Sequence, residues 1–242
     1  IQRVFADYAD INPSEIGTGR VRRCHLKDDK FGGEIILYDD NDNNGSGFTS
    51  DLNDNLVEIL DRCLNLRKNV YMSNILFSEH SKKCLESCQS CLRSYSNTRS
   101  HGLLDWRSAM SYIRTLVDKN YRCGLDGNFS FPELNDWQEN AILAASKVLE
   151  SRNPKDGWNL GSSSSADSSI SIPVLSKTQS DGVKECIIFI HPLWDQSQPS
   201  GVLYDAYMSA LNNFENITFI DTFNALRRPT WAFINRLKHD VR

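Results

Sequence analysis

Three cysteines within eight residues constrain the fold of this chain more than any other feature of its sequence. Cys84, Cys88 and Cys91 are separated by three and by two residues. A Cys-x2-Cys step lets two thiolates face one ion about 2.3 Å away from a single tight turn. Cys84 lies close enough upstream to bind the same ion. The pattern therefore predicts a metal site.

A structural zinc site takes four ligands, so a fourth residue must join the three cysteines. His80 is the nearest candidate and gives the pattern His-x3-Cys-x3-Cys-x2-Cys. Cys63 is the second candidate, although it falls on the apolar face of an expected helix. Zinc (Zn²⁺) is the preferred ion because thiolates and an imidazole suit it, and an iron–sulfur cluster is the alternative cofactor.

Disulfide bonds and unligated thiols are two other interpretations of the cysteine cluster. Three cysteines this close together cannot all pair among themselves. The sequence shows no signal peptide, and we expect a cytoplasmic protein, in which disulfides are rare. A metal site is therefore favoured over both interpretations.

Length and charge set the outer limits on function. The 242 residues can form one large domain or two small ones, and no apolar run approaches the ~20 residues that span a membrane. The net charge of −4 gives no overall attraction to nucleic acid, so any such contact must come from a local patch. Because the chain starts at Ile1 without a methionine, we expect it to be part of a longer protein.

The hydrophobic pattern predicts a mixed α/β (α+β) fold in three parts. The first is a zinc-stapled domain of short strands and amphipathic helices over residues 1–151. It includes a buried strand over residues 33–39 and helices near 51–63, 103–119 and 134–150. A linker or long surface loop follows over residues 152–183, where serine and glycine accumulate.

The third part, residues 184–242, alternates strand and helix signals. Strands are expected at 186–190 and 217–221, and helices at about 203–212 and 229–238. This order predicts a small parallel β-α-β-α lobe. So small a lobe is expected to dock on strands from the first domain or from the rest of the parent protein.

Several short motifs occur in an order that resembles a known family. They are Tyr38-Asp39, Gly45-Ser46-Gly47-Phe48, the cysteine cluster continued by Leu92-Arg93-Ser94-Tyr95-Ser96-Asn97, and Leu104-Asp105-Trp106-Arg107. Over residues 33–120 this order is similar to the MrfA-like zinc-binding domain. The resemblance implies a domain found at the C-terminus of superfamily 2 DNA helicases and in helicase-associated phage-defence proteins of the DISARM type. Helicase-borne members carry four cysteines, whereas three are clustered in this chain, so the resemblance leaves the fourth ligand open.

The residues around the cysteines form a basic patch on an acidic chain. Residues 82–107 contain five lysines and arginines against two acids. Arginine and lysine neutralise phosphates, and exposed aromatic rings stack on unpaired bases. The predicted nucleic-acid contacts are Lys83, Arg93, Tyr95 and Arg99. The alternative is a solvated basic face with Tyr95 and Trp106 in the core. This alternative is favoured for Asp105, Trp106 and Arg107, because they open an amphipathic helix.

No phosphate-binding loop of the form G-x4-G-K-[ST] is present, so this chain carries no ATPase motif of its own. His191 and Asp195 could form a catalytic pair after a strand, but a buried histidine with satisfied hydrogen bonds is the favoured interpretation. Arg227-Arg228-Pro229 could bind a phosphate at a helix N-terminus, or an acidic partner surface.

The leading hypothesis is a non-catalytic zinc module of a DNA helicase or an anti-phage defence protein, whose partners are DNA and the helicase motor domains or a partner subunit. The alternatives are a protein–protein scaffold held together by zinc and a small independent α/β enzyme. No membrane partner is expected.

Overall fold

The computed structural model describes residues 1–19, 22–25, 31–40, 47–65, 68–76, 79–163 and 170–238. The chain divides into two compact units, Ile1–Lys83 and Cys84–Arg242. The boundary therefore lies beside the cysteine cluster and not near residue 151, where the sequence predicted the end of the first domain. Within the described ranges, none of the helices combines the length and the apolar character needed to cross a membrane.

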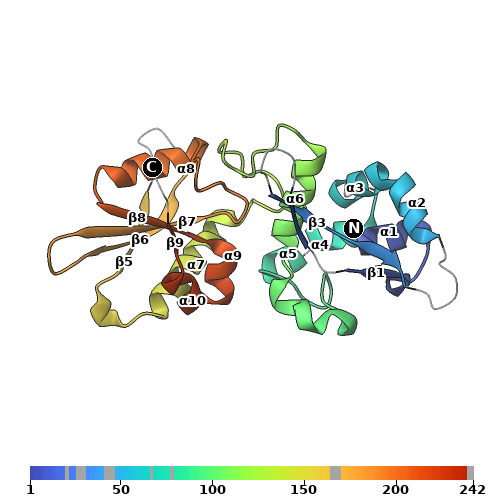
Figure 1. Cartoon of the computed structure of the whole chain (residues 1–242), viewed down its shortest axis with the longest axis horizontal. Coiled ribbons are helices and arrows are strands. Elements are labelled where there is room, and N and C mark those ends of the chain that lie inside the picture. Colours follow the sequence, from blue (N-terminus) through green and yellow to red (C-terminus); the bar gives the residue numbers. More distant parts are fainter. Residues whose placement is uncertain are drawn as a thin grey trace. The chain divides into compact units, whose positions relative to one another are not determined.

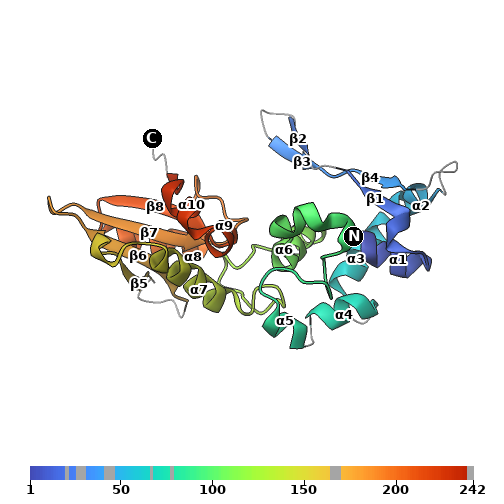
Figure 2. The ribbon, with the colours of Figure 1, turned by 90° about the horizontal axis from the view of Figure 1, so that it is seen from below.

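Unit 1 consists of short helices and two pairs of antiparallel strands. Its elements are α1 (Gln2–Ala9), η1 (Pro13–Glu15), β1 (Ile16–Thr18), β2 (Arg22–His25), β3 (Phe31–Glu34), β4 (Leu37–Asp39), α2 (Phe48–Asp54), α3 (Leu56–Leu64), α4 (Val70–Leu76) and α5 (Glu79–Lys83). Strand β1 pairs with β4 and β2 pairs with β3, and Figure 2 shows the second pair beyond the first. The core between α1 and α3 contains Phe5 and Ile59, both fully buried.

The buried strand expected over residues 33–39 is instead two short strands. Strand β3 ends at Glu34 and β4 begins at Leu37. Ile35 between them is 52% exposed and Tyr38 is 45% exposed, so this apolar run does not form a core strand. Asp39, at the end of β4, accepts hydrogen bonds from the backbone N–H groups of Gly47 and Thr49 at the start of α2 (3.1 and 2.8 Å). The intervening residues 41–46, which include Gly45, lie outside the described residues.

Unit 2 begins with the cysteine cluster and ends in an α/β lobe. Its elements are η2 (Tyr95–Leu103), α6 (Trp106–Val117), α7 (Trp137–Glu150), η3 (Pro154–Asp156), β5 (Asn159–Ser163), β6 (Ile172–Thr178), β7 (Lys184–Ile190), α8 (Gly201–Leu211), β8 (Asn216–Asp221), α9 (Thr222–Arg227), α10 (Pro229–Ile234) and β9 (Leu237–Lys238). The strands form one sheet in the order β5-β6-β7-β8-β9. Only β7 and β8 are parallel, and α8 connects them. Figure 1 shows α8 on one side of this sheet and α9 and α10 on the other.

Both faces of the sheet are covered because the central strand β7 is apolar throughout residues 186–190 and its successive side chains point to opposite faces. On one face, Ile188 of β7 and Phe219 of β8 pack with Leu203 of α8. On the other face, Ile187 and Phe189 pack with α7, α9 and α10. The result is a three-layer α/β/α arrangement, which confirms the mixed α and β class predicted from the sequence.

Two details of the predicted lobe are wrong. The stretch 152–183 contains strands β5 and β6, so the lobe takes its extra strands from the predicted linker. Strand β5 is polar because it lies at the sheet edge, and Pro173 interrupts the apolar pattern of β6, which weakens the strand signal. The sheet is consequently mixed. The last predicted helix also ends earlier, at Ile234, before β9. The serine-rich residues 164–169 lie outside the described residues.

Candidate metal centre

Four side chains around the cysteine cluster come together as a group that could hold a metal ion. They are His80, Cys84, Cys88 and Cys91, and their ligand atoms all lie within 4.8 Å of one another. Helix α5 contributes His80, and the three cysteines follow on the loop after it. We call residues 84–91 the metal loop. This is the group predicted from the spacing.

The separation of two sulfur atoms fits metal ligation better than a disulfide. The Sγ atoms of Cys84 and Cys91 are 3.9 Å apart, and neither residue forms a disulfide. Two thiolates at about 2.3 Å from a tetrahedral zinc ion lie about 3.8 Å apart, whereas disulfide sulfurs lie about 2.05 Å apart. The Cys-x2-Cys turn also donates the Cys88 N–H to the sulfur of Cys91 (3.0 Å), an orientation that favours the thiolate.

The ring orientation of His80 also fits a ligand role. Its Nδ1 lies 3.3 Å from the carbonyl oxygen of Ile75 in α4. Because a carbonyl only accepts, this contact selects the tautomer in which Nδ1 carries the proton and Nε2 is the electron-pair donor. Hydrogen bonds of this kind commonly orient metal-binding histidines.

The thiols of the metal loop are unfavourable as free thiolates. Burial, together with the charges of Cys91 and Cys88, raises the pKa of the Cys84 thiol to about 12. Burial also raises the pKa of Cys91. A bound cation reverses this preference, because thiolates and not thiols bind the metal. The donor set therefore suits a divalent ion that prefers sulfur and nitrogen.

Cys63, the other candidate for the fourth ligand, lies elsewhere. It is buried in α3 and does not belong to the group. Burial raises the pKa of its thiol. The apolar spacing of α3 had placed Cys63 on the core face, and the structure bears this out.

The first turn of α6 holds the backbone of the metal loop. The indole Nε1 of Trp106 donates to the carbonyl of Cys84 (2.9 Å). The guanidinium of Arg107 donates to the carbonyls of Cys84 and Leu85 (2.7 and 3.0 Å). Its Nε binds Asp136 (2.9 Å), and a second nitrogen pairs with the other carboxylate oxygen. Trp106 is buried, as predicted. Arg107 is buried as well, although the sequence favoured a solvated position for it, and the sequence did not reveal that both residues bind the loop.

The predicted nucleic-acid residues differ in accessibility. Tyr95 is 99% exposed, and Lys83 and Arg99 are exposed as well. Arg93 is half-buried, and its Nε donates to the hydroxyl of Ser87 inside the metal loop (2.9 Å). Arg93 therefore has a structural contact that its sequence position did not predict.

The segment that presents Tyr95 is fixed by side-chain hydrogen bonds. Asn97 accepts from the Ser94 N–H (2.8 Å) and donates to the carbonyl of Leu92 (2.8 Å). His101 Nε2 lies 3.0 Å from the Ser94 carbonyl oxygen. These bonds hold the start of η2 against the end of the cysteine turn, so the Tyr95 ring projects from an ordered backbone.

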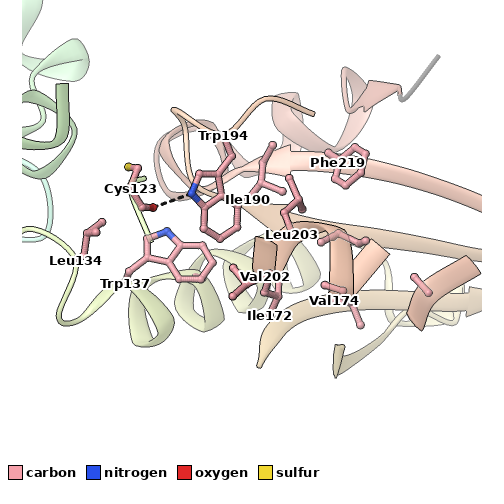
Figure 3. Packing of buried hydrophobic residues seen from close by; sticks show 14 of the residues in the cluster. Cys123, Leu134, Trp137, Ile172, Val174, Ile190, Trp194, Val202, Leu203 and Phe219 are labelled. Carbon is pink, nitrogen blue, oxygen red and sulfur yellow. Dashed lines mark hydrogen bonds between the residues drawn. The ribbon is translucent and has the colours of Figure 1, made fainter. Parts of the chain in front are cut away.

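His191 lies in the core and its closest polar neighbour is a residue that sequence analysis overlooked. Its Nδ1 is 3.1 Å from the sulfur of Cys123. Trp194 Nε1 donates to the Cys123 carbonyl (2.8 Å), as Figure 3 shows beside Trp137. Burial lowers the pKa of His191 to about 3 and raises that of Cys123 to about 11. Both groups are neutral at pH 7, the opposite of an activated thiolate–imidazolium pair.

The two arginines before α10, which the sequence offered as a phosphate site or a contact for an acidic surface, both have partners within this chain. The side chain of Arg227 is only 8% exposed and pairs with Asp105 (2.9 Å). Arg228 donates to the side chain of Asn224 (2.8 Å) and stacks on the ring of Trp231 at 3.8 Å. Helix α10 also has only six residues. The acidic group that Arg227 contacts is therefore a residue of this chain, Asp105, and not part of a partner protein.

No family model matches the chain, and comparisons with curated proteins and with solved structures find no match either.

Proposed function

We propose that this chain is a non-catalytic zinc-binding module that contacts DNA through residues on both sides of its metal loop. The His80–Cys84–Cys88–Cys91 group carries the proposal. Three thiolates and one imidazole are a common ligand set for structural zinc, and such sites take four ligands without an open position. The resemblance to the MrfA-like domain supports a place in a DNA helicase or a helicase-associated defence protein.

Two exposed cations and one exposed aromatic ring support the DNA contact. Lys83, Tyr95 and Arg99 are all exposed near the metal loop. Phosphates attract the two cations, and the tyrosine ring is available to stack on an unpaired base.

Metal content is the first measurement. Protein purified without chelator should contain about one equivalent of zinc by elemental analysis, because a four-ligand structural site binds a single ion. Cys88→Ser should lose most of it. Cys186→Ser is the matched control, because Cys186 is a buried thiol in β7 outside the group. Less than a tenth of an equivalent in the unaltered protein would exclude the zinc site.

DNA binding is the second measurement. Two phosphate contacts predict a log–log salt slope of about −1.4 on single strands and about −1.8 on duplex. Lys83→Gln with Arg99→Gln should flatten the slope. Tyr95→Ala should weaken binding to single strands by about 1 to 3 kcal/mol without changing the slope. Arg93 is left unaltered because it supports the loop through Ser87.

A protein–protein scaffold is the second candidate function. Leu103, at the end of the same η2 segment, is 69% exposed, and an apolar partner could cover it together with Tyr95. If the zinc-loaded chain binds neither single-stranded nor duplex DNA at low salt, the DNA-binding role is excluded and the scaffold is favoured.

A further inference from the structure

An arginine of the α/β lobe reaches the metal loop with a side chain that is largely shielded from solvent. Arg227, the last residue of α9, donates from Nη2 to the carboxylate of Asp105 (2.9 Å) and to the carbonyl of Leu104 (3.1 Å). Its guanidinium lies 3.8 Å from the ring centroid of Phe223, within α9. These contacts fix the end of α9 against the residues that precede α6.

The same guanidinium faces an acidic side chain between two metal ligands. Arg227 Nε lies 3.7 Å from Oε2 of Glu86, and Glu86 stands between Cys84 and Cys88. This Nε is buried and has no hydrogen-bond partner among the described residues. An unsatisfied buried donor is costly, so a movement of the metal loop that brings Glu86 closer is favourable.

The backbone of the metal loop is hydrogen-bonded to the start of α6, next to the residue that Arg227 contacts. The Glu86 carbonyl accepts from the N–H of Trp106 (3.0 Å), one residue after Asp105. The position of Glu86 therefore depends on its two flanking ligands and on the first turn of α6. A metal ion that fixes Cys84 and Cys88 also fixes the carboxylate that Arg227 faces.

We propose that Arg227 is a positioning residue that couples metal binding in the loop to the seating of α9 on the lobe. The inference rests on the proposed metal site. One divalent ion, three thiolates and a neutral imidazole together carry a net charge of −1. The positive charge of the nearby guanidinium stabilises this negative cluster. Coupling between two sites is reciprocal. Metal binding orders α9, and a seated α9 raises the affinity for metal by the same factor.

Zinc affinity in Arg227→Met tests the proposal. Methionine keeps much of the apolar stem and removes the charge. Competition against a chromophoric zinc chelator should show affinity lowered about 10-fold, the lower end for residues that support metal ligands. Arg228→Met is the matched control, because Arg228 contacts Asn224 and Trp231 instead. It should stay within twofold of the unaltered chain.

Hydrogen exchange gives a readout that does not depend on affinity. Chelation of the unaltered protein should accelerate exchange in residues 222–228, although none of them is a ligand. In Arg227→Met this region should exchange at one rate with and without zinc. Glu86→Gln, which alters the loop side of the pair, should reproduce both effects if Arg227→Met folds poorly.

The outcomes separate the inference from the proposed site. An unaltered chain that holds no zinc excludes the metal site itself. A chain that holds zinc with the same affinity in Arg227→Met and Glu86→Gln, and with exchange in α9 insensitive to chelation, overturns the coupling alone.

Discussion

His191 follows strand β7 and is buried as a neutral ring. Its Nδ1 accepts from the N–H of Leu193 (3.2 Å) and lies beside the Cys123 thiol. Burial lowers its pKa to about 3, against an ordinary value of 6.5. The folded protein therefore excludes a proton that the unfolded chain accepts.

This difference predicts acid sensitivity. Above pH 6.5 both states are neutral at His191 and the stability is fully present. Below pH 6.5 only the unfolded chain gains the proton, and stability falls by about 1.4 kcal/mol per pH unit down to about pH 3. At pH 4.5 the loss is about 2 to 3 kcal/mol. His191→Asn keeps an acceptor but does not titrate, so urea midpoints of the two proteins at the same zinc concentration should converge on acidification. If the urea midpoints of the two proteins fall in parallel with pH, His191 is not the source of the acid sensitivity.

Helix α6 is the element on which the metal loop depends. Its N-cap, Asp105, accepts from the N–H of Ser108 (2.7 Å) with one oxygen and from Arg227 with the other. Trp106 and Arg107 then bind the loop carbonyls. One helical turn therefore carries a cap, an ion pair and the support of the metal loop.

Two substitutions of Asp105 separate these roles. Asp105→Asn keeps an oxygen that can cap the helix but removes the charge that pairs with Arg227. Asp105→Ala removes both. Urea unfolding should show Asp105→Ala less stable than Asp105→Asn by about 1 kcal/mol, the usual cost of a lost cap. Equal stabilities would mean that the cap contributes nothing here.

At the scale of the molecule, the metal loop lies where the two compact units meet along the chain. The metal loop is the first segment of unit 2, and α6 joins it to the lobe through Arg107 and Asp136. A metal that binds only the folded loop is linked to the folding of unit 2.

Thermal unfolding monitored by tryptophan fluorescence tests this linkage. All five tryptophans lie in unit 2, so the signal reports that unit. At free zinc 100 times the dissociation constant, the added stability is about 2.7 kcal/mol, and the midpoint should rise by about 5 to 10 °C. A midpoint that zinc leaves unchanged in a zinc-binding protein would show that the site and the lobe unfold independently.

The sequence by itself determined the features that depend on local spacing. The x3 and x2 intervals bring three thiols to one point, and His80 is the nearest candidate for the fourth ligand, whereas the choice between His80 and Cys63 needed the tertiary structure. The amphipathic pattern of α3 assigns Cys63 to the core, and the strand–helix–strand order from β7 to β8 predicts the parallel pair. Each of these depends on residues close together in the chain, where backbone geometry fixes direction.

Only the tertiary structure decided what depends on distant residues. Strand β5 is polar because it lies at the sheet edge, so its composition resembles a linker until β6 pairs with it. Arg227 resembles a phosphate ligand in sequence, but 122 residues separate it from Asp105, its partner. Cys123 and His191 meet across 68 residues. Only the folded structure determines whether such charged and polar groups bind partners within the chain or stay exposed and free to bind other molecules.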